Sequence, residues 1–344
     1  MKVDPEVLEY IGSDLDDDQF NVAALRLFRR QAKTNSVYRR YLAGVNTVPD
    51  HLTHWTQIPA LPADSFKDQR VASFPPIERC QTFRTSGTTA DKTGTHEFAT
   101  LEYYEKSLIS GFQRFMPPVA DHHWVSLIPS FEDRPESSLS YMVSYLEEHV
   151  ASRSVDYHCD ESFNFSSEHL LDHLISLFES DEPVFLLGTS FAHARFAEEL
   201  RDNIIRTEVP RSFVMFDTGG YKGHHRRYSP NEFLELMGSS LGVEPRQVWN
   251  EYGMTELSSQ AYARLDEGVH RFPPWTRVIL RDPATGTICQ TGEQGLIQIV
   301  DLANVGSVCA IQTLDIAIQE DVGIGLLGRA DRADLRGCSL NYEI

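Results

Sequence analysis

The chain has 344 residues, with 31 basic and 50 acidic side chains and a formal net charge of -19. This acidity argues against a nucleic-acid partner, because phosphate backbones are bound by clustered Lys and Arg, and the chain has only six lysines. Hydrophobic residues make up 41% of the sequence, which is enough material for a buried core. No run approaches the roughly 20 apolar residues that cross a bilayer, and the N-terminus lacks a secretion signal, so we expect a cytoplasmic protein with no membrane span.

The cysteines are scattered along the chain and are odd in number. They are Cys80, Cys159, Cys289, Cys309 and Cys338, and none of them forms a CxxC pair. Neither a disulfide framework nor a zinc ribbon is therefore predicted.

The N-terminal part of the chain has the pattern of amphipathic helices. Over residues 20–45 the apolar side chains recur at helical spacing and arginines occupy the other face, which predicts a helical lead-in. The proline-rich stretch 58–68 follows, and we expect it to be an irregular connector.

Beyond this connector, short apolar runs alternate with helical patterns. The runs are 125–128, 184–187, 213–216 and 248–249, and the helical patterns lie near 135–149, 166–179, 190–206 and 230–241. Uninterrupted apolar strands that alternate with helices predict a parallel sheet covered on both faces. The last helix has a capping box, Ser229-Pro230-Asn231-Glu232, with proline at its first helical position, and Gly242 provides its stop.

Beyond about residue 270 the helical signal fades, and strand patterns joined by turns follow, as in 295–301. A smaller, mostly β subdomain is therefore expected. The predicted organisation is an α/β protein with a helical lead-in at 1–60, an α/β region at 61–268 and a β-rich subdomain with a C-terminal tail at 269–344.

One apparent catalytic signature is discarded. Gly238-Ser239-Ser240-Leu241-Gly242 fits the G-x-S-x-G nucleophile elbow, but that motif needs a strand before the serine. Here a capped amphipathic helix precedes it, so we interpret the segment as a helix end.

Residues 85–95 form a hydroxyl-rich segment that contains glycine and one lysine and has no apolar residue larger than alanine. Glycine lets backbone N–H groups turn toward an anion, hydroxyl groups add donors, and Lys92 adds positive charge. The segment therefore suits phosphate, although a Ser/Thr-rich surface turn would have the same composition.

A second feature directly follows the last apolar strand. It is Asn250-Glu251-Tyr252-Gly253-Met254-Thr255-Glu256, and the ends of parallel strands are where ligands bind. Glycine beside an aromatic ring allows a planar base to approach Tyr252, while Thr255 and Glu256 offer a hydroxyl group and a carboxylate that suits magnesium. A plain turn after a strand is the alternative.

Together these motifs resemble those of the adenylate-forming enzymes, the superfamily of acyl-CoA synthetases, luciferases and adenylation domains. The matching segments, in order, are Thr85-Ser86-Gly87-Thr88-Thr89, Asp217-Thr218-Gly219-Gly220, Tyr252-Gly253-Met254-Thr255-Glu256, Gln312-Thr313-Leu314-Asp315, Gly328-Arg329 and Arg336-Gly337. Within this superfamily the chain most resembles the bacterial acyl-protein synthetases, the long-chain-fatty-acid ligases of bacterial luminescence. That narrower match rests on 127–130, 134–139, 187–191, 252–256 and 335–340.

The resemblance implies the large N-terminal domain of the adenylate-forming fold, with parallel α/β subdomains and a smaller β-rich subdomain. It also implies ATP-dependent activation of a carboxylic acid, expected to be a fatty acid, to an acyl-adenylate, with ATP and Mg2+ as cofactors. Thr85, Ser86, Gly87, Thr88, Thr89 and Lys92 would hold the departing phosphates, and Gly219, Gly220, Tyr252 and Gly253 would frame the adenine. Thr255 and Glu256 would engage the α-phosphate, Glu256 would bind the magnesium, and Asp315 and Arg329 would hold the ribose.

The chain departs from the superfamily pattern in two places. Family loops usually continue G-x-P-K-G, whereas Ala90 stands here and no proline precedes Lys92. The chain also ends at Ile344, so we expect it to lack the C-terminal lid domain, whose lysine reaches the α-phosphate. Lys222, beside Gly219 and Gly220, is the lysine hypothesised to supply part of that charge.

The resemblance also gives a role to Cys338. In the acyl-protein synthetases a cysteine close to the C-terminus takes the acyl group as a thioester and passes it to a partner reductase. Arg332 and Arg336 lie close in sequence and would favour the thiolate, which is the form that attacks. A small buried residue is the alternative for Cys338.

Two other functions stay open. One is a ligase that passes its acyl or aryl group directly to coenzyme A, a carrier protein or an amine. The other is a nucleotide-binding scaffold that has lost catalysis. The expected partners are the carboxylic acid and an acyl-accepting protein, either a reductase or a carrier protein, with no nucleic acid.

Overall fold

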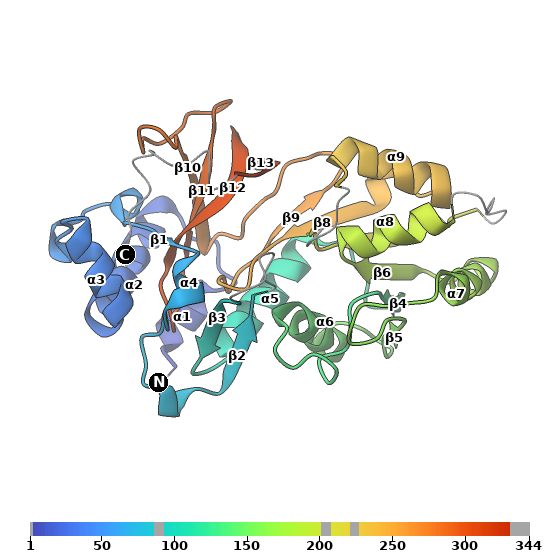
Figure 1. The fold of residues 1–344 in the computed structure, drawn as a ribbon, viewed down its shortest axis with the longest axis horizontal. Coiled ribbons are helices and arrows are strands. Elements are labelled where there is room, and N and C mark those ends of the chain that lie inside the picture. Colours follow the sequence, from blue (N-terminus) through green and yellow to red (C-terminus); the bar gives the residue numbers. More distant parts are fainter. Residues whose placement is uncertain (1–2, 86–92, 201–207, 221–226, 331–344) are drawn as a thin grey trace. The chain divides into compact units, whose positions relative to one another are not determined.

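The computed structural model describes residues 3–85, 93–200, 208–220 and 227–330 (Figure 1). Within these ranges the chain forms two compact units. Unit 1 takes the residues up to Gly111, then Met254–Ala261 and those from Val269 onward, and unit 2 takes Phe112–Gly253 and Tyr262–Gly268. Unit 1 thus draws on all three of the sequence segments 1–60, 61–268 and 269–344, while unit 2 lies within the second.

Unit 2 is built on a sheet in the order β5-β4-β6-β7-β8-β9. Its strands are β4 (His123–Ser126), β5 (Asp156–Tyr157), β6 (Val184–Gly188), β7 (Val214–Asp217), β8 (Val248–Tyr252) and β9 (Ala261–Arg264). The pairs from β5 through β8 are all parallel, which confirms the arrangement predicted from the apolar runs. The helices between them are α6 (Ser138–His149), α7 (Ser167–Glu179), α8 (Ser190–Glu199) and α9 (Pro230–Leu241).

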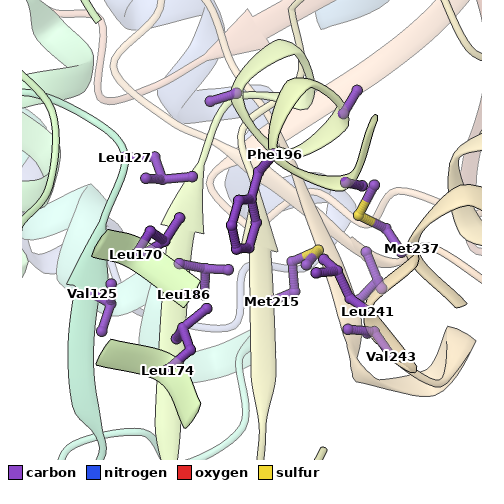
Figure 2. Packing of buried hydrophobic residues seen from close by; sticks show 14 of the residues in the cluster. Val125, Leu127, Leu170, Leu174, Leu186, Phe196, Met215, Met237, Leu241 and Val243 are labelled. Carbon is purple, nitrogen blue, oxygen red and sulfur yellow. The ribbon is translucent and has the colours of Figure 1, made fainter. Parts of the chain in front are cut away.

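Alternate residues of these strands face opposite sides of the sheet, as strand geometry requires. On one side, Leu186 and Met215 pack with the buried residues of α7, α8 and α9 (Figure 2). On the other side, Phe185 and Phe216 contact Phe112 of α5 (Glu102–Phe115) at ring-centroid distances of 6.2 and 6.0 Å. The strands are apolar on both faces because both faces are covered.

Helix α9 begins and ends where the sequence predicts. The Ser229 side chain accepts from the backbone N–H of Glu232, and the Glu232 side chain accepts from the N–H of Ser229, which completes the capping box. Gly242 ends the helix with φ at 74°, a left-handed conformation that glycine adopts without strain. The segment that mimics a nucleophile elbow is therefore the end of a helix.

Unit 1 contains a mixed sheet in the order β1-β12-β11-β10, with β13 also paired to β12. The pairs among β10, β11, β12 and β13 are antiparallel, and the β1–β12 pair is parallel. The strands are β1 (Leu61–Pro62), β10 (Thr276–Arg281), β11 (Gln294–Asp301), β12 (Ala310–Glu320) and β13 (Gly323–Arg329). A separate hairpin joins β2 (Gln81–Arg84) to β3 (Thr95–Phe98). The β-rich character expected beyond residue 270 is confirmed.

The connector 58–68 is more regular than its prolines suggest. It contains β1, which runs parallel to β12 at the edge of the sheet, and the single-turn helix α4 (Ser65–Asp68). Proline is tolerated in a two-residue edge strand because it leaves few ladder hydrogen bonds to lose. The prediction of an irregular connector was therefore wrong.

The N-terminal helices of unit 1 are α1 (Pro5–Tyr10), α2 (Asp17–Thr34) and α3 (Ser36–Gly44). The helical pattern predicted over 20–45 is divided at Asn35, whose side chain caps α3. Buried Gln31 fixes α2 to the β-rich part, because its Nε2 donates to the Asn304 carbonyl oxygen at 2.8 Å and its Oε1 accepts from the Cys309 N–H at 2.7 Å. Among the described residues, no helix is long and apolar enough to cross a membrane.

Candidate functional site

In unit 2, the carboxyl ends of three parallel strands carry a buried polar network around Asp217. This residue ends β7 and is 3% exposed. The Ser190 hydroxyl group donates its one proton to this carboxylate, with Oγ at 2.8 and 2.9 Å from the two carboxylate oxygens, and Asn250 Nδ2 donates at 2.6 Å. Because Ser190 follows β6 and Asn250 lies on β8, one carboxylate joins the ends of all three strands.

Burial raises the pKa of Asp217 to about 6, against the opposing effect of the hydrogen bonds from Ser190, Asn250 and the Gly219 N–H. A buried carboxyl group that receives this many donors is a fixed structural anchor.

The turn that follows Asp217 contains two adjacent glycines, so part of its backbone is not covered by side chains. Gly219 and Gly220 have φ at 68° and 90°, the left-handed region that glycine adopts without strain. Their carbonyl oxygens accept from the N–H groups of Ser190 and Phe191, both at 3.3 Å. The turn is thus held against the start of α8 and leaves a surface that a planar group can approach closely.

Tyr252 and Gly253 lie at the end of β8 in the same unit. The turn reaches this strand end, since a Cβ built on Gly219 would lie 4.0 Å from the carbonyl oxygen of Glu251, the residue before Tyr252. The structure therefore brings the glycine turn close to the end of β8.

In unit 1, the hydroxyl-rich segment is the connection between β2 and β3. Ser86, Gly87, Thr88, Thr89 and Lys92 lie outside the described residues. At its base, the Gly94 N–H donates to Thr85 Oγ1 at 2.7 Å and the Thr85 N–H donates to the Gly94 carbonyl oxygen at 2.9 Å. The two ends of the segment are thus fixed to each other.

The segment that carries Thr255 and Glu256 is held by hydrogen bonds to its backbone. His96 Nδ1 lies 2.8 Å from the Thr255 carbonyl oxygen, and Asn304 Nδ2 donates to the Glu256 carbonyl oxygen at 2.8 Å. Because a carbonyl oxygen only accepts, His96 carries its proton on Nδ1. Burial lowers the pKa of His96 to about 4, so the ring stays neutral at physiological pH.

The next turn of this segment is tied to the end of β11. Asp301 is fully buried and accepts from the Ser258 N–H at 3.0 Å and from Ser259 Oγ at 2.7 Å. Asp301, the last residue of β11, and Asn304, in the turn that follows, thus fix the segment from Glu256 to Ser259.

Glu256 itself is 6% exposed, and burial raises its pKa to about 7. The charges of Arg329 and Lys67 oppose this shift, whereas the charge of Asp64 adds to it. The part of the chain that the structure describes contains no group of three or more acidic, His or Cys side chains placed to hold a metal ion. Glu256 is thus a single buried carboxylate with cationic side chains nearby.

Asp315 and Arg329 are cross-strand partners on β12 and β13. Arg329 Nε lies 4.0 Å from Asp315 Oδ1. Since the charge of Arg329 also acts on Glu256, unit 1 gathers the predicted residues Asp315, Arg329 and Glu256 into one neighbourhood.

Two predicted catalytic residues, Lys222 and Cys338, lie outside the described residues. Conversely, the structure adds residues that were not predicted as part of the site, namely Asp217, Ser190, His96, Asn304 and Lys67. Asp217 had a usable signal, since it is an acidic residue directly after an apolar strand in a parallel sheet. Lys67 had none, because it lies in the proline-rich connector, far from any motif in sequence.

The described architecture is that of the adenylate-forming ligases. It matches the crystal structure of 2-hydroxyisobutyryl-CoA ligase in complex with R3-HIB-AMP, with a TM-score of 0.69 and 13% identity over 92% of this chain and 68% of that one. It also matches O-succinylbenzoate coenzyme A synthetase from Bacillus subtilis in complex with ATP and magnesium, with a TM-score of 0.50 and 19% identity over 72% of this chain and 49% of that one. The expected fold class is confirmed.

Within this class, a model of the acyl-protein synthetase family LuxE matches residues 3–343, and the chain belongs to that family. A relative, the long-chain-fatty-acid–luciferin-component ligase of Vibrio harveyi, is 22% identical over 326 residues, which are 90% of this chain and 83% of the relative. The resemblance noted from the sequence is confirmed, and the protein is a ligase of the AMP-forming type.

Proposed function

We propose that this protein activates a fatty acid with ATP and then carries the acyl group on its own Cys338. In the first step a carboxylate oxygen of the acid attacks the α-phosphorus of ATP. The bond between this phosphorus and the leaving pyrophosphate oxygen breaks, and an acyl-adenylate is left. The observation that carries the proposal is the buried Glu256, on which the charge of Arg329 acts, in a chain that belongs to the acyl-protein synthetase family.

The Glu256 site has the chemistry that Mg2+ requires. Mg2+ is usually bound by one or two carboxylates together with substrate phosphates, rather than by a cage of protein ligands. A single buried carboxylate with a raised pKa fits this role, because a divalent cation would favour its ionised form. When bound there, Mg2+ would neutralise charge on the phosphates as pyrophosphate departs.

The other residues would bind and orient the nucleotide. In unit 2, Gly219, Gly220, Tyr252 and Gly253 offer bare backbone and an aromatic ring to adenine. In unit 1, Asp315 would accept hydrogen bonds from ribose hydroxyl groups and Arg329 would donate to the same ribose. Thr255 and the segment anchored at Thr85, with Ser86, Gly87, Thr88, Thr89 and Lys92, would hold the phosphates.

In the second step the Cys338 thiolate would attack the carbonyl carbon of the acyl-adenylate. A thioester bond forms, the bond to the phosphate oxygen breaks, and AMP leaves. This step is supported by the resemblance of residues 335–340, which contain Cys338, and by the membership of the chain in the acyl-protein synthetase family. A reductase or a carrier protein would then receive the acyl group. The printed name of the Vibrio harveyi relative supports a long-chain fatty acid as the substrate.

The test is self-acylation. Incubation with ATP, MgCl2 and a radiolabelled fatty acid should leave hydroxylamine-sensitive label on the wild-type protein, at up to one acyl group per chain by intact mass. Cys338→Ser should lose this label but still release pyrophosphate when the acid is present.

The matched control is Cys80→Ser, which replaces an exposed cysteine and should keep the label. Label that persists on Cys338→Ser would exclude this acceptor and would favour a ligase that hands its acyl group directly to coenzyme A, a carrier protein or an amine.

A further inference from the structure

Helix α4 packs against His96 and Gly94 in unit 1. These residues adjoin the Thr255–Glu256 segment and the hydroxyl-rich segment, to which the proposed function assigns the phosphates. Phe66, on α4, is 1% exposed and packs edge-on against the His96 ring, with the ring centroids 5.4 Å apart. A Cβ built on Gly94 would lie 3.2 Å from the Phe66 carbonyl oxygen, so the end of the hydroxyl-rich segment also abuts α4.

The same His96 connects α4 to the Thr255–Glu256 segment through its hydrogen bond to the Thr255 carbonyl oxygen. Phe66, His96 and Thr255 therefore form a continuous chain of contacts inside unit 1. Helix α4 is thus connected through His96 to the residue that precedes Glu256.

Lys67 follows Phe66 on α4. It is 23% exposed, and its Nζ lies 2.8 Å from Asp64 Oδ1. Its charge and that of Arg329 both lower the pKa of Glu256, while Asp64 raises it. Lys67, Arg329 and Glu256 thus share one electrostatic neighbourhood although they come from distant parts of the sequence.

Stabilisation of the fold does not explain why Lys67 lies at this position. The Lys67–Asp64 pair joins residues three positions apart at a partly exposed site, and ion pairs of this kind contribute little to stability. An ammonium group, by contrast, is a compact point charge that binds phosphate well.

We propose that Lys67 binds the phosphates of the nucleotide and supplies positive charge beside Glu256 during adenylate formation. This inference rests on the proposed function and assigns to Lys67 a role that the sequence assigned to Lys222. It also gives the connector 58–68 a function, since α4 carries the lysine to the site.

The test compares ATP with adenosine as calorimetric probes, both with MgCl2. Lys67→Met should weaken ATP binding at least tenfold and leave adenosine binding within twofold of wild type, because only ATP carries phosphates. Lys67→Arg should recover part of the ATP affinity. Lys33→Met, which removes an exposed lysine at the end of α2, is the matched control and should bind ATP like the wild type.

Unchanged ATP affinity in Lys67→Met would overturn the proposal. So would an equal loss of ATP and adenosine affinity together with a lowered Tm, since that pattern indicates a structural role. Asp64→Asn is a second way to distinguish phosphate binding by Lys67 from a structural role. It breaks the ion pair with Lys67, yet it should keep or strengthen ATP binding. If the wild type binds ATP but forms no acyl-adenylate, the proposed function fails while this comparison still decides the role of Lys67.

Discussion

At the scale of single residues, the charge state of Glu256 is the property most open to measurement. Its pKa of about 7 in the folded protein lies above the ordinary value of 4.5, because burial disfavours the ionised form. The folded state therefore retains a proton on Glu256 between these two pH values, where the unfolded state has lost it. Stability must then fall as the pH rises from about 4.5 to 7, by linkage.

Glu256→Gln should remove this pH dependence. We expect the free energy of unfolding of the variant, relative to wild type, to be about 2 to 3 kcal/mol higher at pH 8 than at pH 5. Urea denaturation of both proteins at the two pH values measures this difference. A difference that does not change with pH would mean that Glu256 ionises like an exposed carboxyl group.

At the scale of elements, β13 places Arg329 opposite Asp315, and its start is fixed by a close backbone contact. A Cβ built on Gly323 would lie 2.1 Å from the His270 carbonyl oxygen, and this backbone atom has no room to move aside without breaking its own bridge to Ile324. Only glycine fits there, so the position of the strand depends on this residue.

Gly323→Ala should lower the free energy of unfolding by about 1 to 3 kcal/mol, the usual range for forcing extra atoms into a packed site. Thermal unfolding gives the comparison with wild type. Gly44→Ala is the control, since a Cβ there meets nothing within 4 Å, and it should leave Tm nearly unchanged or raise it slightly. Equal Tm values for Gly323→Ala and Gly44→Ala would show that Gly323 does not pack against the His270 carbonyl oxygen.

Elements with a strong local signal were predictable from the sequence. The apolar runs predicted β4, β6, β7 and β8, because a sheet covered on both faces needs uninterrupted apolar strands. Helix α9 was predictable from its capping box and terminal glycine. By contrast, β1 and α4 are too short to show periodicity, and tertiary contacts with β12 and His96 decide their conformation.

The residues of the candidate site also differ in whether the sequence could predict them. Glu256, Asp315 and Arg329 could be proposed from the sequence because each belongs to a segment that resembles a family motif. Lys67 and His96 were missed because their connection to Glu256 and Thr255 exists only after folding. Asp217 was predicted only in part. The sequence showed that it lies in a segment resembling a family motif, but its hydrogen bonds to Ser190 and Asn250 could not be predicted before the structure.

At the scale of the whole molecule, the matched residues are distributed over two units, each with its own supporting network. Asp217 fixes the glycine turn in unit 2, and Asp301 with Asn304 fixes the Thr255–Glu256 segment in unit 1. Both networks are buried and satisfied, which is typical of positions where geometry must be maintained.

Acid-dependent exchange of radiolabel between pyrophosphate and ATP shows directly whether this protein forms an acyl-adenylate. With MgCl2 and a panel of straight-chain fatty acids, the wild-type protein should catalyse exchange with at least one acid. The exchange should disappear when the acid or the magnesium is removed, and it should fall at least tenfold in Glu256→Gln. ATP binding without exchange for any acid in the panel would contradict the proposed formation of an acyl-adenylate. Exchange that is unaffected by Glu256→Gln would contradict the proposed role of Glu256.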